Sequence, residues 1–150
     1  MSRFRSARPR RVAVGAVAVV GLAAAALAAP ATASPDSVPL NVGQETTGSD
    51  TGASGSFTYA IDGDQLCYTL TARHLSVPAV MAHVHVGPRK VAGPIVVPLS
   101  VGEGTAFSVS ECVTADPALL ADIDADPRAY YINVHTPTFP GGEIRGQLTH

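Results

Sequence analysis

The sequence predicts an all-β domain, a sandwich or barrel of seven or eight short strands with one short helix near residues 116–126. Three observations predict it. Runs of alternating apolar and polar residues recur after residue 37, turn residues such as Gly, Pro and Asp separate most of them, and only the stretch 116–126 has the character of a helix. Short strands with regular turn signals are typical of sandwiches and barrels. The length of 150 residues allows one such domain beside a targeting segment.

The clearest local prediction is a hairpin. The runs 56–61 and 66–72 both alternate apolar with small or polar residues, and Asp62-Gly63 lies between them. An Asp-Gly pair between two alternating runs is a strong signal for a two-residue primed turn. Before the hairpin, a weakly alternating run at 38–42 predicts the first strand, and a loop rich in Gly, Ser, Thr and Asp follows at 43–55.

The remaining elements follow in chain order. Five further strands are expected at 80–86, 94–99, 105–113, 130–135 and 143–148. The helix lies between the third and fourth of these. Asp116 is suited to cap its N-terminus, and Pro117 is suited to the first turn, where a backbone N–H is not needed.

The N-terminus has the pattern of a targeting segment. Five arginines in residues 2–11 precede an apolar run at 12–29, and Ala31-Thr32-Ala33 forms a small-residue cleavage site. This order predicts a secretory signal peptide at 1–33. A membrane anchor is the alternative, but nine Ala and two Gly make the apolar run only weakly hydrophobic.

Cleavage would leave a linker at 34–37 and a domain at 38–149. We expect a secreted protein, extracellular or in the cell envelope, with no membrane span after cleavage. Arg10-Arg11 leaves the twin-arginine export route open beside the general one. Residues 34–150 contain five Lys and Arg against twelve Asp and Glu, a net charge of −7. Nucleic acid is excluded as an expected partner, because phosphate contacts need clustered positive charge.

Cys67 and Cys112 are the two cysteines of the chain. An even pair in an exported domain favours a disulfide over two unrelated thiols. Alternation places Cys67 on a strand face with Thr69, and Cys112 on a face with Ser110, so both lie away from the main core. A bridge over this separation would stabilise the fold by about 4 kcal/mol in the chain-entropy view.

Metal-binding side chains gather in two predicted strands. Alternation places His83 and His85 on one strand face, about 6.5–7 Å apart along it, and His135 on the outer face of another strand. If these faces adjoin, the three imidazoles suit copper or zinc. The alternative is a solvated or hydrogen-bonded pair of histidines held by Glu143 and Arg145, without metal.

Three further polar residues are expected beside the histidines. Asn133 shares the face of His135, and the return strand places Glu143 and Arg145 next to them. We expect Glu143 and Arg145 to be structural partners, an exposed pair that can also orient the histidines, and not catalytic groups. No catalytic residue is predicted, because the chain has no G-x-S-x-G motif and its cysteines are expected to be paired.

Several motifs together resemble the CHRD domain, named for chordin. They are AHVHVG at 82–87, GPIVVPL at 93–99, NVHT at 133–136 and GEIRGQ at 142–147, and the resemblance covers about residues 38–149. It implies an antiparallel, immunoglobulin-like or superoxide-dismutase-like Greek-key sandwich in an exported protein. The resemblance assigns no molecular function.

The resemblance includes a distant similarity to copper–zinc superoxide dismutases. These carry copper on an H-x-H strand and a distant strand histidine, which correspond here to His83, His85 and His135. They also need a bridging histidine and a zinc loop, and this chain has no histidine between His85 and His135. Dismutase activity is therefore not expected, whereas a mononuclear copper site is compatible with the residues.

These observations favour an exported, non-enzymatic module with a structural or interaction role. Its partner would be an extracellular protein or a cell-surface component that the sequence does not identify. The alternative is a copper- or zinc-binding protein that uses His83, His85 and His135. A redox enzyme built on that site ranks third.

Overall fold

The computed structural model describes residues 37–150. The predicted signal peptide at 1–33 and all but the last residue of the predicted linker at 34–37 lie outside the described residues. No helix within residues 37–150 is long and apolar enough to cross a membrane.

The described residues form eight strands, one α-helix and two short 3-10 helices. In chain order these are β1 (Val38–Asn41), η1 (Val42–Gln44), β2 (Ser54–Asp62), β3 (Gln65–Arg73), β4 (Met81–Val86), β5 (Ile95–Leu99), β6 (Phe107–Thr114), α1 (Pro117–Ala125), η2 (Pro127–Ala129), β7 (Tyr130–His135) and β8 (Ile144–Gln147). The prediction of an all-β antiparallel fold with one short helix is confirmed, and most strand boundaries agree within one or two residues.

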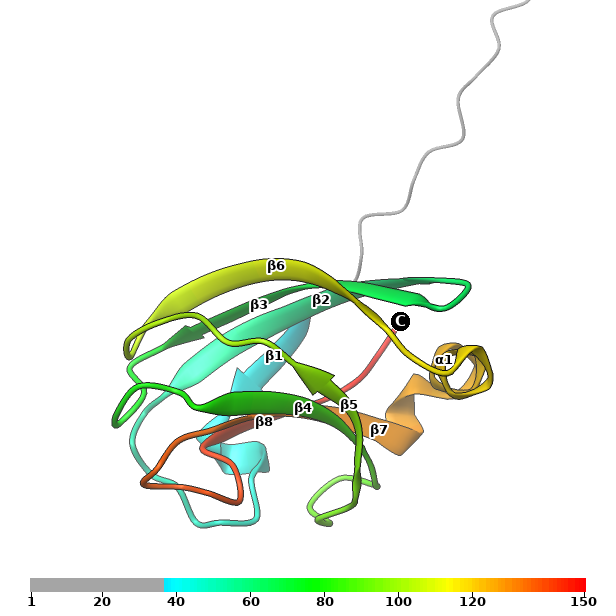
Figure 1. Cartoon of the computed structure of the whole chain (residues 1–150). Helices are drawn as coiled ribbons and strands as arrows, with labels where there is room; N and C mark the ends of the chain where they lie inside the picture. Colours follow the sequence, from blue (N-terminus) through cyan, green and yellow to red (C-terminus); the bar gives the residue numbers. More distant parts are fainter. Residues whose placement is uncertain (1–36) are drawn as a thin grey trace, which may run out of the picture. The chain divides into compact units, whose positions relative to one another are not determined.

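The eight strands make one continuous, curved sheet in the order β5-β4-β7-β8-β1-β2-β3-β6. Every pair is antiparallel. The contact between β8 and β1 is short, a single partner pair of Asn41 and Arg145, and the sheet folds over there into two facing layers. Figure 1 shows β2, β3 and β6 above and β4, β5, β7 and β8 below.

The core lies between the two layers. Alternation directs one side chain in two from each strand into it, as the sequence pattern requires. Fully buried apolar side chains from both layers meet there, among them Val38, Leu40, Phe57, Leu66, Leu70, Ala82, Val84, Ile132, Val134 and Ile144. Helix α1 adds Leu120 and Ile123 at one end, and the side chain of Asp116 caps the helix by accepting a hydrogen bond from the backbone N–H of Ala118 at 2.8 Å.

The predicted hairpin is present, but its turn lies one residue further along. Asp62 pairs with Gln65, so the two loop residues are Gly63 and Asp64. Gly63 has a φ of +61° and stands first in the loop, which is the arrangement of a type II′ turn. The sequence pattern placed this glycine second, because Asp62 reads as a turn residue although it completes the strand.

The predicted disulfide between Cys67 and Cys112 is present. The two residues are direct partners in the pairing of β3 with β6. Cys67 is half-buried and Cys112 exposed, so the bridge lies on the outer face and fastens β6, an edge strand, to its neighbour.

A candidate metal centre of three histidines

Three histidines from neighbouring strands meet on the outer face of the lower layer. His83 and His85 alternate along β4, and His135 is the last residue of β7, which pairs with β4. Ala82 and Val84 occupy the core-facing positions of β4, so the histidines between and after them point outward. The structure thus brings together the three side chains that the sequence analysis singled out.

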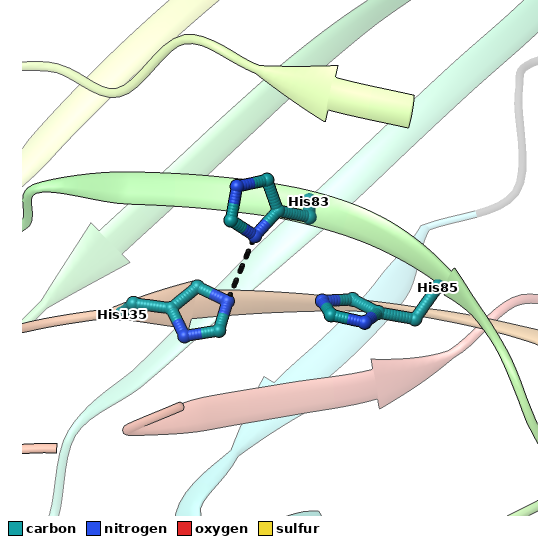
Figure 2. A group of neighbouring side chains, drawn as sticks. All are labelled: His83, His85 and His135. Atoms are coloured by element: carbon teal, nitrogen blue, oxygen red, sulfur yellow. Dashed lines mark hydrogen bonds between the residues drawn. The ribbon is translucent and has the colours of Figure 1, made fainter. Parts of the chain in front are cut away.

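Their ring nitrogens lie close enough to share one ion. One nitrogen from each histidine lies within 4.8 Å of the corresponding nitrogens of the other two. Nδ1 of His83 and Nε2 of His135 are 3.0 Å apart, and the ring of His85 lies beside them (Figure 2). The ring centroids are separated by 4.8 to 5.9 Å.

Two backbone carbonyls determine which nitrogens carry protons. Nδ1 of His85 is 2.9 Å from the carbonyl oxygen of Gly93, and Nδ1 of His135 is 2.9 Å from that of Pro140. A carbonyl oxygen only accepts, so each Nδ1 donates its proton there in the neutral ring. The Nε2 atoms of His85 and His135 therefore carry the lone pairs and are the acceptors of these two rings. Such second-sphere contacts are how proteins orient metal-ligating histidines.

One of these lone pairs has no hydrogen bond of normal geometry. Nε2 of His85 is buried and makes no hydrogen bond of normal geometry with the described residues, although the side chain of Asn133 interacts with this ring. Nε2 of His135 faces Nδ1 of His83, which donates to it in the metal-free protein. A buried nitrogen without a well-formed hydrogen bond costs free energy, and a bound cation would satisfy it.

The histidines are buried, with exposed fractions of 8% for His83, 6% for His85 and 5% for His135. Burial, together with the neighbouring His135 and His85, lowers the pKa of His83 from 6.5 to about 4. Burial also lowers the pKa of His85 and of His135, although the hydrogen bonds of His85 to Gly93 and Asn133, and that of His135 to Pro140, act in the opposite direction. All three rings are therefore neutral at pH 7, the state in which imidazole binds metals.

A stack of planar groups fixes the ring of His85. Tyr131 stacks on it with a centroid distance of 4.8 Å and an interplanar angle of 6°. The guanidinium of Arg145 lies over the ring of Tyr131, with its central carbon 3.3 Å from the ring centroid. Alternation along β7 already placed Tyr131 on the same face as Asn133 and His135, so the pattern contained it although the prediction did not use it.

The expectation of an exposed Glu143–Arg145 pair is wrong. Glu143 is 0% exposed and Arg145 1% exposed, and their hydrogen bonds go to other groups. The carboxylate accepts from Thr51 and Thr136 and from both the backbone and the hydroxyl of Ser76.

The guanidinium of Arg145 has its own partners. It donates to the carbonyl oxygens of Val91 and Pro88 at 2.8 and 2.9 Å, and to the side-chain oxygen of Gln147. The physical reason for the burial is that loops at 42–53, 87–94 and 136–143 cover this face of the layer, as Figure 1 shows below β4, β7 and β8. The prediction assumed that the face was open to solvent.

The side chains of Asn133 and Glu45 are buried beside each other on the same face of the layer. Asn133 is 1% exposed, pairs in register with Arg145, and its side-chain N–H₂ lies 3.3 Å from the carbonyl oxygen of Gly141. Glu45 is buried near it, and burial raises the pKa of this carboxyl above 4.5. Gly142 lies between them with a φ of +122°, a backbone conformation that favours glycine, and a Cβ there would also lie 2.3 Å from an oxygen of Glu45 and 2.7 Å from the side-chain nitrogen of Asn133. The sequence analysis assigned Glu45 no role, because it lies in a loop without a periodic pattern.

Gly93 is a second residue whose role the sequence analysis did not predict. It had been interpreted only as part of a Gly-Pro turn, yet its carbonyl oxygen holds His85 and its N–H donates to the hydroxyl of Tyr131 at 3.0 Å. A Cβ at this position would lie 1.7 Å from the carbonyl oxygen of Val86, so only glycine fits. The contact between this loop and His85 therefore requires glycine at position 93, and the Gly-Pro turn signal alone does not reveal that requirement.

Comparison with known proteins gives a family but no close relative. No curated protein and no solved structure matches the chain. The CHRD domain family matches residues 37–148, which include every strand of the described sheet. The chain therefore belongs to the CHRD domain family.

Proposed function

We propose that this CHRD module is an exported metal-binding protein that holds one copper or zinc ion between His83, His85 and His135. The ligand atoms are Nδ1 of His83 and Nε2 of the other two. The observation that carries the proposal is the convergence of one nitrogen from each ring within 4.8 Å, in a buried site.

The orientation of the rings supports metal binding over a purely structural role. Two of the three rings are held from behind by carbonyl oxygens, so that their unprotonated nitrogens face the centre of the group. Nε2 of His85 is buried without a hydrogen bond of normal geometry, although the side chain of Asn133 interacts with the ring, so this nitrogen is able to accept a cation. Binding requires only that His83 carry its proton on Nε2, which is a change of tautomer and not of charge.

The chemistry of the donor set restricts the ion. Neutral imidazole suits copper and zinc, whereas calcium and magnesium prefer oxygen ligands. The carboxylate of Glu143 is already bound by four donors from the protein, so it offers no free oxygen to a harder ion.

The disulfide supports the proposed location. Disulfides such as the one between Cys67 and Cys112 form and persist outside the reducing cytoplasm. An exported protein encounters metal ions that the cytoplasm does not control, and a binding site there can capture or store them. The interaction role expected from the sequence remains the competing proposal.

Titration calorimetry with Zn(II) and Cu(II) tests the metal site on protein made without a polyhistidine tag. The variants are His85→Gln and His135→Gln, whose side chains can still donate to the carbonyls of Gly93 and Pro140. We expect affinity to fall by about 100-fold or more, since each removes a direct ligand and not merely a neighbour of one.

His74→Asn is the matched control. His74 is exposed, lies outside the cluster and has a φ of +58°, a conformation that asparagine tolerates. It should bind both ions as the unchanged protein does. Absence of binding in the unchanged protein, or equal affinity in all variants with unchanged circular dichroism, would overturn the metal site and leave the histidines as structural residues.

A further inference from the structure

A fourth potential ligand stands next to the histidines. Met81 precedes His83 by two residues on β4, so strand alternation places both side chains on the same face. In the pairing of β4 with β7, Met81 is the direct partner of His135. Side chains of directly opposed residues on one face have Cβ atoms about 4.5–5.5 Å apart. Met81 is thus adjacent to one histidine along its strand and to another across the ladder.

The side chain of Met81 is not used by the core. It is 45% exposed, whereas the next residue, Ala82, is fully buried. Two of the exposed large apolar residues of the described chain pair with a site histidine, Met81 with His135 and Ile95 with His85, and of the two only Met81 carries a potential ligand atom. Its unbranched side chain has three rotatable bonds, so the sulfur can swing toward the cluster without disturbing the fold.

Thioether sulfur changes which ion the site prefers. It is a soft ligand suited to Cu(I), while the usual protein ligands of zinc are thiolate, imidazole and carboxylate. Three imidazoles leave one position of a four-coordinate ion open. On the basis of the proposed function, we propose that Met81 supplies that fourth ligand through its sulfur and that the site selects Cu(I) over Zn(II).

Competition against a chromophoric Cu(I) chelator under anaerobic conditions, with ascorbate present, tests the selectivity. Met81→Leu keeps the size and apolarity of the side chain and removes the sulfur. We expect its Cu(I) affinity to fall on the order of tenfold, less than for loss of a histidine, because a methionine thioether can be a weak, long-range ligand of copper. Its Zn(II) affinity should not change.

Val80→Leu is the matched control. Val80 is 52% exposed and immediately precedes Met81. Because successive side chains alternate in direction, Val80 does not share the face that carries Met81 and His83. It should bind both ions as the unchanged protein does. If Met81→Leu binds Cu(I) as tightly as the unchanged protein, or loses affinity for both ions equally, the thioether role is overturned while the three-histidine site stands. If the unchanged protein binds neither ion, the proposed function itself fails.

A spectroscopic measurement locates the sulfur directly. The chain has two methionines, Met1 and Met81, and only Met81 lies in the described domain. Selenomethionine labelling therefore places one selenium at the proposed ligand position. In the Cu(I)-loaded protein, the selenium absorption spectrum should show a copper neighbour, and it should lose this neighbour when His85→Gln is introduced. A selenium spectrum without copper in protein that holds Cu(I) would contradict the proposal.

Discussion

The central guanidinium carbon of Arg145 lies 3.3 Å from the centroid of the Tyr131 ring. Tyr131 in turn stacks on His85 at 4.8 Å, so one aromatic ring contacts both a buried cation and one of the three clustered histidines. Arg145 is 1% exposed. Its charge is stabilised by two backbone carbonyl oxygens, by the face of the Tyr131 ring and by the carboxyl of Glu45.

Replacing Arg145 with lysine should therefore destabilise the fold although the charge remains. A lysine ammonium can reach one of the carbonyls of Pro88 and Val91, but it cannot bind both in a plane and stack on Tyr131. We expect a loss of about 2 kcal/mol in the free energy of unfolding, measured by urea denaturation. Arg89→Lys, at an exposed position of the same loop, is the control and should change stability by no more than about 0.5 kcal/mol.

Replacing Glu143 with alanine should destabilise the fold more than replacing it with glutamine. One carboxylate oxygen accepts from the backbone N–H of Ser76, and the other accepts only from the hydroxyls of Ser76 and Thr136. Hydroxyls can reverse and accept, so a glutamine amide fits with its N–H₂ on that side. We expect a loss of about 1 kcal/mol for Glu143→Gln and about 3 kcal/mol for Glu143→Ala.

The control for this pair is Glu111→Ala on β6, where the side chain is exposed and should contribute little. Equal losses for Glu143→Gln and Glu143→Ala would mean that the charge of the carboxylate, and not its geometry, stabilises the loops. In that case the hydrogen-bond assignment given above would be wrong.

The metal-free protein should lose stability on acidification. The folded pKa values of His83, His85 and His135 lie below 6.5, and that of His83 is about 4. Between these values the unfolded chain binds protons that the folded chain does not, so the free energy of unfolding falls as the pH falls. The urea midpoint, measured in chelator, should decrease from pH 7 to pH 5, and less steeply in His83→Gln.

Glu45 acts in the opposite direction. Burial raises its folded pKa above 4.5, so its contribution favours the folded state at low pH and is lost as the pH rises through that value. Glu45→Gln removes this opposing contribution and should steepen the acid-induced loss. If the urea midpoint did not change between pH 7 and pH 5 in either the unchanged protein or Glu45→Gln, the histidines would not be desolvated as the structure indicates.

Strand alternation was sufficient to predict the faces of the site. It placed His83 with His85 and Asn133 with His135, because a period of two is dictated by the backbone alone. It could not show that this face is buried. That depends on the loops at 87–94 and 136–143, which are held by long-range contacts such as Arg145 to Pro88, and such contacts leave no local pattern.

Turn and cap signals were also sufficient where the interaction is local. Asp116 caps the helix that its own sequence predicts, and Gly63 adopts the positive φ that a primed turn requires. Met81 shows the limit of the same reasoning. Its position beside His135 follows from the pairing of β4 with β7, which the sequence suggested only through resemblance.

Export should yield a protein that begins near Ser34. Ala31-Thr32-Ala33 supplies the small residues that a signal peptidase needs, so cleavage after Ala33 is expected. Intact-mass spectrometry of secreted protein measures this directly. Ala33→Phe should block cleavage, and retention of residues 1–33 in the unchanged protein would favour the anchor interpretation.

Gly93→Ala should impair both the proposed metal site and the stability of the fold. The added Cβ would lie 1.7 Å from the carbonyl oxygen of Val86, which is backbone and cannot turn aside. The loop must therefore shift, and its carbonyl oxygen then no longer holds Nδ1 of His85. We expect a stability loss of about 1–3 kcal/mol and a loss of metal affinity of about 10–100-fold.

The control is Gly43→Ala, where the nearest obstacle to a Cβ is the side-chain oxygen of Asn41 at 3.3 Å. Because Asn41 can adjust, this variant should keep its metal affinity. The two losses in Gly93→Ala are separable by measuring Zn(II) affinity well below the unfolding temperature, where the variant is folded. If stability falls while affinity stays unchanged, the carbonyl of Gly93 does not orient His85, since a ring free to rotate would bind less tightly even in a folded protein.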